Sequence, residues 1–335
     1  MPKKSTKALY FEHLTDNGVK CLLCPHYCII GEGRRGFCGV RMNDKGTLIS
    51  LNYGHVTSLG IDPVEKKPLY HFHPGSGILS IGSYGCNMHC PFCQNYTISR
   101  IEYAGNYFEA TPRDILENAE KTGSGYAAFT YNEPVVFFEF MLDSAKLLSG
   151  RGIKNVIVSN GQISAEPLDE LLPWISAANI DIKSFKSDFY SRYAGGDLKT
   201  AKTTAERIFK AGKHLELTFL LIPGKNDDMS EFMKMTEWIS SISKEIPFHI
   251  SRYFPQYKET APPTPEEQLV HFGKAAMKNL NFVYLGNTMM PGTSDTICPS
   301  CGKTVITRKG YTVKNTLKEG KCPYCGYSIY GEWDV

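Results

Sequence analysis

Residues 85–95 read GCNMHCPFCQN and hold three cysteines, Cys86, Cys90 and Cys93, separated by three and then two residues. Structural zinc sites and closed iron–sulfur clusters each take four protein ligands. Three thiolates can hold three irons of a [4Fe–4S] cube and leave the fourth iron open, and an open position is typical of a reactive metal site. The alternative is a zinc ion completed by His89 or by a distant residue.

The composition is that of an ordinary globular protein. The chain has 335 residues, of which 42% are hydrophobic, and a net charge of +3, too small to indicate a nucleic-acid partner. Its basic N-terminus lacks the apolar core of a signal peptide, and its apolar runs are too short to span a membrane. We therefore expect a cytoplasmic protein with no membrane partner.

The cysteines fall into three groups. In a reducing cytosol eleven cysteines do not predict disulfides, and their clustering indicates metal binding. The C-terminal group forms two CPxCG pairs separated by twenty residues, a pattern typical of zinc-ribbon knuckles with a structural role: Cys298, Cys301, Cys322 and Cys325. A rubredoxin-like iron site is the main rival.

The N-terminal group has the spacing C-x2-C-x3-C-x9-C: Cys21, Cys24, Cys28 and Cys38. Both zinc and an auxiliary [4Fe–4S] cluster fit these four thiolates. The short segment and the complete ligand set favour zinc, whereas a cluster would be a candidate electron relay.

Between the outer groups, strand-like runs alternate with amphipathic helical stretches. We expect strands at residues 78–84, 126–131, 155–159, 179–183, 215–222, 248–253 and 282–285, and helices at residues 112–122, 135–148, 166–176, 200–211, 229–243 and 265–277. Such alternation predicts an α/β fold, a partial (β/α)6-type TIM barrel whose chemistry lies at the carboxyl ends of its strands.

This order divides the chain into three parts. We expect a four-cysteine metal module with its linker at residues 1–75, the barrel at 76–287, and a zinc-ribbon-like module at 288–335.

The run CNMHCPFC matches CxxxCxΦC, where Φ is an aromatic residue, and so resembles the signature of radical S-adenosylmethionine (SAM) enzymes. The resemblance implies that SAM chelates the open iron of the [4Fe–4S] cluster. One electron then cleaves SAM to methionine and a 5′-deoxyadenosyl radical, which is oxidoreductase-type chemistry. Phe92 is the aromatic residue and is expected near the adenine.

Other residues at strand ends are candidates for binding SAM. Asn132 and Glu133 lie in TYNEP, which occupies the place of the family's Gly-Gly-Glu-Pro-like motif. The other candidates follow or lie on later strands: Ser159, Asn160, Asp181, Lys183, His249 and Arg252. Asp181 and Lys183 share one face by strand alternation and resemble the Asp-x-Lys element of glycyl-radical-enzyme activases. Each residue could instead only cap a helix or a turn.

Four longer sequence blocks resemble one particular family of radical SAM enzymes. CxLCPHxC…GxCGVRxN, DPxEKKPLYHFxPGS, GCNxxCxxCQN and TYNEP together resemble the radical SAM component of the AmmeMemoRadiSam system, a family related to pyruvate formate-lyase activating enzymes. The resemblance implies a functional link to AMMECR1-domain and Memo-like proteins, and radical chemistry implies an electron donor such as flavodoxin or ferredoxin.

Three functions follow. The first is a radical SAM enzyme whose radical abstracts hydrogen from, or adds to, a small-molecule or nucleobase substrate. The second is an activase that generates a glycyl radical on a partner protein, although the ferredoxin-like insert common among activases is missing after Gln94. The third is a metal-containing nucleic-acid-binding module, which the modest charge disfavours.

Overall fold

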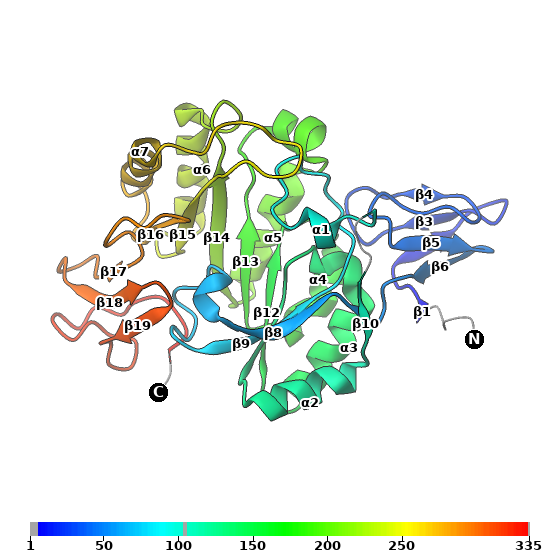
Figure 1. Cartoon of the computed structure of the whole chain (residues 1–335), viewed down its shortest axis with the longest axis horizontal. Coiled ribbons are helices and arrows are strands. Elements are labelled where there is room, and N and C mark those ends of the chain that lie inside the picture. The colour runs from blue at the N-terminus through cyan, green and yellow to red at the C-terminus, as the bar shows by residue number, and fades with distance from the viewer. Residues whose placement is uncertain (1–5, 103–105, 334–335) are drawn as a thin grey trace.

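A computed structural model describes residues 6–102 and 106–333. Within them, the largest sheet has eight strands in the order β16-β15-β14-β13-β12-β11-β9-β8 (Figure 1). Its strands are β8 (Ser58–Pro63), β9 (Gly77–Gly82), β11 (Tyr126–Phe129), β12 (Lys154–Ser159), β13 (Ala177–Asp181), β14 (His214–Leu221), β15 (Phe248–Arg252) and β16 (Val283–Gly286). From β9 to β16 the neighbours are parallel, and β8 pairs antiparallel with β9. The expected α/β class with a mostly parallel sheet is confirmed.

Helices connect the parallel strands. They are α2 (Pro112–Thr122), α3 (Phe138–Ser149), α4 (Ala165–Leu171), α5 (Leu198–Lys210), α6 (Met229–Ile242) and α7 (Glu266–Ala276). The start of α2 is the expected one, because the Thr111 side chain accepts a hydrogen bond from the Asp114 N–H and the Asp114 carboxylate accepts one from the Thr111 N–H. Shorter turns are α1 (Tyr96–Ser99), three 3-10 segments (Val64–Lys66, Pro134–Phe137, Leu172–Trp174) and a π-helix (Phe189–Ala194).

The inner face of the sheet is closed at the amino ends of its strands. There Ile78, Ala128 and Val156 pack with Val64 and Phe72 of the preceding linker in one buried apolar cluster. On the same faces of β9 and β13, Ser80 and Asn179 follow further along the strands, and in parallel α/β folds the chemistry lies at the carboxyl ends of the strands.

The N-terminal module consists of two small sheets beside the main one. Its strands are β1 (Thr6–Lys7), β2 (Phe11–His13), β3 (Val19–Cys21), β4 (Ile29–Ile30), β5 (Arg41–Asp44) and β6 (Thr47–Ser50), and a separate pair joins β7 (His55–Val56) to β10 (Phe108–Glu109). The buried Arg41 guanidinium donates two hydrogen bonds, of 2.8 and 2.9 Å, to the Glu139 carboxylate of α3. A buried ion pair of this kind holds the module against the main domain.

The C-terminal module lies at the opposite end of the long axis (Figure 1). Its strands are β17 (Thr296–Ile297), β18 (Thr304–Lys309) and β19 (Thr312–Asn315). Its apolar residues form a core with Phe282 and Tyr284 at β16. The main sheet also takes in β8, which belongs to the segment expected in the N-terminal module. Among the described residues no helix has the length and apolarity that crossing a membrane requires.

Candidate active site

The three central cysteines lie on the loop that follows β9, at the carboxyl edge of the parallel sheet. The loop begins at Gly85, whose φ is +91°. A Cβ there would lie 2.6 Å from Val40 Cγ1 and 3.2 Å from the Cys38 carbonyl oxygen. Glycine therefore lets the loop bend while its backbone packs against the N-terminal module.

Protein groups surround each of the three thiols. Asn160 Nδ2 lies 3.8 Å from Cys86 Sγ, and Cys93 Sγ lies 3.2 Å from Ser99 Oγ. Burial raises the pKa of the Cys86 thiol, and it raises that of Cys90 to about 11 against the lowering effect of Lys183. A bound cation is what keeps such buried thiols deprotonated.

The spacing of these thiols fits a cluster better than a single ion. Among the described residues, only the C-terminal cysteines bring three or more His, Cys, Asp or Glu ligand atoms within 4.8 Å of one another. The thiols of Cys86, Cys90 and Cys93 thus stand farther apart than ligands of one metal. In a [4Fe–4S] cube each thiolate binds its own iron, so the residues present fit that group.

Glu133 joins the carboxyl ends of β11 and β12. Its Oε1 accepts hydrogen bonds from Ser159 Oγ at 2.8 Å and the Val135 N–H at 3.0 Å, while Oε2 accepts from the Asn160 N–H at 2.8 Å. Burial raises the pKa of this carboxyl to about 7, although the three donors lower it. The structure therefore brings Glu133, Ser159 and Asn160 together with Cys86.

The Asp181–Lys183 pair lies at the end of β13. Lys183 Nζ donates to Asp181 Oδ2 at 2.7 Å, which confirms that the two side chains share a face. Burial alone lowers the pKa of Lys183, but the Asp181 carboxylate and the Cys90 thiolate raise it above its ordinary value. The pair thus faces the Cys90 side of the loop.

Phe92 and Asn132 lie in the walls of this region. Phe92 is buried and stacks on Tyr193, with ring centroids 5.7 Å apart. Asn132 Oδ1 accepts from the Ser83 N–H at 3.0 Å, and its Nδ2 donates to the Gly85 carbonyl at 3.1 Å. In this structure Asn132 fixes the base of the thiol loop.

His249 and Arg252 are not brought to the thiols. His249 Nε2 lies 2.6 Å from Glu216 Oε2 in a second buried polar cluster. Arg252 donates from Nε to the Thr264 carbonyl at 2.7 Å and from Nη1 to Glu266 at 3.2 Å. Glu216 lies on the neighbouring strand β14, whereas the two partners of Arg252 follow its own strand β15.

Sequence reasoning missed several residues that shape the loop. Asn87 Nδ2 donates to the Gln162 carbonyl at 2.7 Å, and Asn87 Oδ1 accepts from Asn160 at 2.9 Å. Arg100 Nη1 donates to the Met88 carbonyl at 3.2 Å. Asn87 lies inside the cysteine motif, which could have pointed to it, but nothing near Arg100 in the sequence signals this contact.

The outer cysteine groups differ from each other. In the C-terminal group Cys298 Sγ lies 3.6 Å from Cys325 Sγ, and Cys301 Sγ lies 3.7 Å from Cys322 Sγ. These are the separations of ligands on one metal ion. The N-terminal cysteines line one pocket without gathering in this way: Cys21, Cys24, Cys28 and Cys38.

Comparisons with known proteins match the part of the chain that contains the thiol loop. The Radical SAM superfamily model matches residues 80–236, which include all three central cysteines. An uncharacterized protein, MJ0808, of Methanocaldococcus jannaschii is 39% identical over 330 residues, 96% of this chain and 98% of that protein. A pyruvate formate-lyase-activating enzyme of Streptococcus mutans is 21% identical over 234 residues, 65% of this chain and 87% of that enzyme.

Among solved structures, Streptococcus suis SuiB bound to S-adenosylmethionine is similar at a TM-score of 0.49 and 16% identity, over 67% of this chain and 53% of that one. A domain of a pyruvate-formate lyase-activating enzyme from Bacteroides vulgatus is similar at a TM-score of 0.43 and 20% identity. The match covers 48% of this chain and 98% of that domain. The superfamily match spans the thiol loop and the polar strand ends behind it. The segment that carries the thiol loop therefore belongs to the radical SAM superfamily, which implies a [4Fe–4S] cluster and SAM, and the chain is a radical SAM enzyme.

Proposed function

We propose that Cys86, Cys90 and Cys93 hold the [4Fe–4S] cluster of this enzyme and that SAM binds beside them, at the carboxyl edge of a partial (β/α)6-type barrel. The observation that carries this proposal is the convergence of three thiols with buried polar groups at the ends of β11, β12 and β13. When bound and reduced, the cluster supplies one electron that cleaves SAM to methionine and a 5′-deoxyadenosyl radical, which abstracts hydrogen from, or adds to, a small-molecule or nucleobase substrate.

Different residues of the chain are suited to bind the cluster and the separate groups of SAM. The loop offers three thiolates, one fewer than a closed cluster takes, so one iron is left to an external ligand. The Asp181–Lys183 pair presents both charge signs at one edge, where it can orient the amino and carboxylate groups of SAM. Phe92 and Tyr193 offer aromatic faces suited to an adenine.

Glu133 keeps the strand ends in register beneath this site. Its three hydrogen bonds hold Ser159 and the Asn160 backbone in place, and Asn160 in turn reaches Cys86. Glu133 is therefore a positioning residue that keeps an amide donor aimed at one thiolate. Hydrogen bonds to cluster sulfurs tune reduction potentials, so this contact favours a defined potential at Cys86.

The C-terminal cysteines hold a zinc ion with a structural role. Thiolates on one zinc lie about 2.3 Å from the ion, which places them about 3.8 Å apart in a tetrahedron. The separations of 3.6 and 3.7 Å fit this geometry. A module with so small a core depends on such a metal.

The test is anaerobic reconstitution with iron and sulfide, followed by SAM and a reductant, either dithionite or a flavodoxin- or ferredoxin-type donor. We expect 5′-deoxyadenosine from the wild type and none from Cys90→Ala, a buried thiol on the loop. Cys322→Ala, which removes a buried thiol from the C-terminal module, is the matched control and should retain cleavage per folded molecule. Absence of cleavage by a wild type that holds its cluster and binds SAM would overturn the proposal.

The partners stay predictions that this assay does not address. A functional link with AMMECR1-domain and Memo-like proteins rests on the sequence resemblance alone. Adding such proteins, or candidate small molecules and nucleobases, to the cleavage assay tests the link. A true substrate should raise the rate of 5′-deoxyadenosine formation or yield a new adenosylated product.

A further inference from the structure

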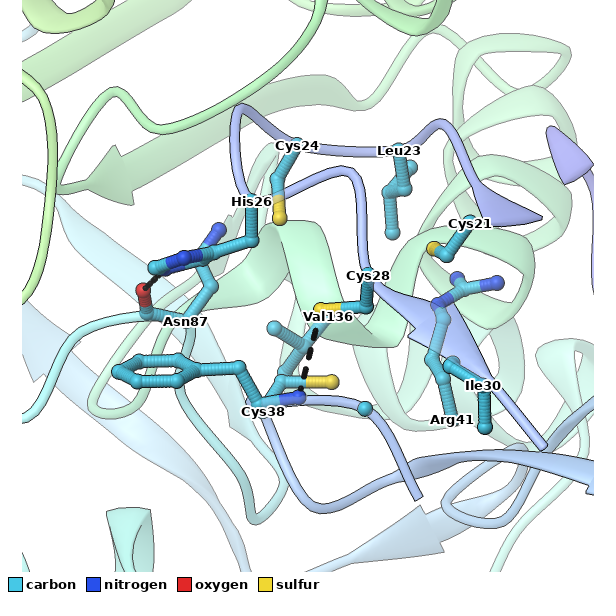
Figure 2. A pocket seen from close by; sticks show the side chains of 12 residues that line it. Cys21, Leu23, Cys24, His26, Cys28, Ile30, Cys38, Arg41, Asn87 and Val136 are labelled. Atoms are coloured by element: carbon cyan, nitrogen blue, oxygen red, sulfur yellow. Dashed lines mark hydrogen bonds between the residues drawn. The ribbon is translucent and has the colours of Figure 1, made fainter. Parts of the chain in front are cut away.

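The four N-terminal cysteines surround a pocket outside the site described above. Figure 2 shows the sulfur atoms of Cys21, Cys24, Cys28 and Cys38 facing one common space. We propose that these four thiolates hold a second [4Fe–4S] cluster and not a zinc ion. This proposal goes beyond the proposed function and does not depend on it, because it concerns different ligands.

The separation of the thiols is the first argument. The C-terminal thiols, with pairs at 3.6 and 3.7 Å, show how this chain arranges four cysteines for a single ion. Among the described residues no other group of three or more such ligand atoms lies within 4.8 Å of one another. The N-terminal thiols thus do not form the tight group that a single ion requires, whereas a [4Fe–4S] cube, in which each thiolate binds its own iron, takes more widely separated thiols.

The lining of the pocket is the second argument. Leu23, Ile30 and Val136 contribute apolar walls (Figure 2), and the Phe37 N–H donates to Cys28 Sγ at 3.4 Å. Hydrogen bonds to the sulfurs and low solvent exposure are the means by which proteins set the reduction potential of an iron–sulfur cluster.

Arg41 supplies a third, independent observation. Its side chain lines the pocket and is fully buried, and Nη1 and Nη2 are engaged by Glu139. Its Nε, also buried, has no hydrogen-bond partner in the described structure. A buried donor without a partner is costly, and a sulfur-rich anionic centre in the pocket would give this N–H the acceptor it lacks.

The pocket adjoins the loop of the three central cysteines. Asn87, the neighbour of Cys86 in the chain, lines the pocket, and its carbonyl lies 2.8 Å from His26 Nε2. Phe37 stacks between His26 and His89, with ring centroids 4.1 and 3.9 Å apart. A second cluster would therefore stand directly beside the first, with Asn87 between them.

The experiment counts metal in full-length protein. A triple variant, Cys86→Ala, Cys90→Ala and Cys93→Ala, removes the central ligands and leaves the pocket intact. After anaerobic reconstitution and desalting we expect about four iron and four sulfide per chain from this variant and about eight of each from the wild type. Mössbauer spectra of the variant should show a [4Fe–4S] centre.

A second variant identifies the ligands. Cys24→Ala with Cys38→Ala should lower the iron of the wild type by about half, whereas Cys301→Ala with Cys322→Ala should leave it unchanged. If the triple variant contains no iron but holds two zinc ions per chain, the proposal is overturned. Failure of SAM cleavage by the wild type, with iron retained in the triple variant, would instead count against the proposed function alone.

Discussion

The two outer cysteine modules contain the same number of thiols but use the rest of the chain differently. The C-terminal thiols meet within a core that the module shares with β16, at the far edge of the sheet. The N-terminal thiols line a pocket whose wall includes Asn87 from the central loop and Val136 from the segment before α3. The C-terminal thiols belong to one module alone and meet at the separation of ligands on one metal ion, whereas the N-terminal pocket is completed by residues of the main domain. Equal ligand counts therefore do not imply equal roles.

The largest expected effect comes from replacing the buried arginine that attaches each module to the main domain. Arg41→Met leaves the buried Glu139 carboxylate, which also accepts the Leu9 N–H at 2.8 Å, without its cation. We expect a loss of about 3–5 kcal/mol in the free energy of unfolding. Chemical denaturation, together with hydrogen exchange of the N-terminal strands, measures it.

Arg308→Met is the matched variant at the other module. Arg308 donates to the Tyr70 carbonyl at 2.6 Å and to Thr296 Oγ1 at 2.9 Å, whereas its buried ionic partner, Glu65 Oε1, lies beyond hydrogen-bond distance at 3.9 Å. Its loss should cost about 1–3 kcal/mol. Equal losses in the two variants would show that the ion pair does not distinguish the modules.

The second prediction concerns activity. Cys24→Ala with Cys38→Ala should reduce 5′-deoxyadenosine formation by about 10- to 100-fold, the range found when groups that support a metal site are removed. The reason is that Cys38 and Val40 pack against Gly85, where the central loop begins.

Removing thiols from the C-terminal module should act on stability instead. Cys301→Ala with Cys322→Ala should change the cleavage rate of folded protein by less than about 2-fold while lowering the thermal midpoint, because a metal ion held by these thiols would contribute folding free energy. Comparable losses of activity in both double variants would contradict the view that the C-terminal thiols only stabilise the fold while the N-terminal thiols support the active site.

The third prediction uses pH. Burial lowers the pKa of His71, which joins the linker to the C-terminal module, to about 3. Between that value and about 6.5 the unfolded chain binds more protons at this residue, so stability falls as the pH falls. From pH 8 to pH 5 the loss is about 2 kcal/mol.

The variant His71→Gln keeps a polar side chain near the Tyr330 carbonyl and the Tyr284 hydroxyl, the two present partners of the imidazole. It should be less stable at pH 8 but show a flatter dependence on pH in denaturant titrations. Both proteins retain every cysteine, so acid effects on the metal sites cancel in the comparison. An unchanged slope would mean that His71 does not control acid stability.

Much of the fold could be predicted because its signals are local. Thr111 and Pro112 mark the start of α2 to the residue, and the apolar run of β14 identifies a buried strand. The Cys86–Cys93 spacing likewise encodes the thiol loop within eight residues. The sequence could not predict contacts between distant residues, such as Arg41 with Glu139 or His26 with Asn87. No local pattern around either residue of such a pair indicates which residue it will contact.

Strand patterns also left pairings between strands and between their side chains open. β8 joined the main sheet as an antiparallel edge, although it precedes the first expected barrel strand. His249 is predicted to bind SAM from its place on a strand, and the structure adds that its Nε2 lies 2.6 Å from Glu216 Oε2 on the neighbouring strand. A strand pattern gives the face on which a side chain lies but not the partner it meets there.

The last prediction tests the aromatic contact between the N-terminal module and the central loop. Phe37→Ala removes a ring that stacks on both His26 and His89. We expect a loss of about 1 kcal/mol in stability, the usual worth of such aromatic pairs, and faster hydrogen exchange in residues 21–38 and 86–93 together. Tyr324→Ala, at a ring 62% exposed on the C-terminal module, should stay within about 0.5 kcal/mol. If exchange quickens in residues 21–38 but not in 86–93, the loop does not depend on the module, and the N-terminal cysteines would only stabilise the fold.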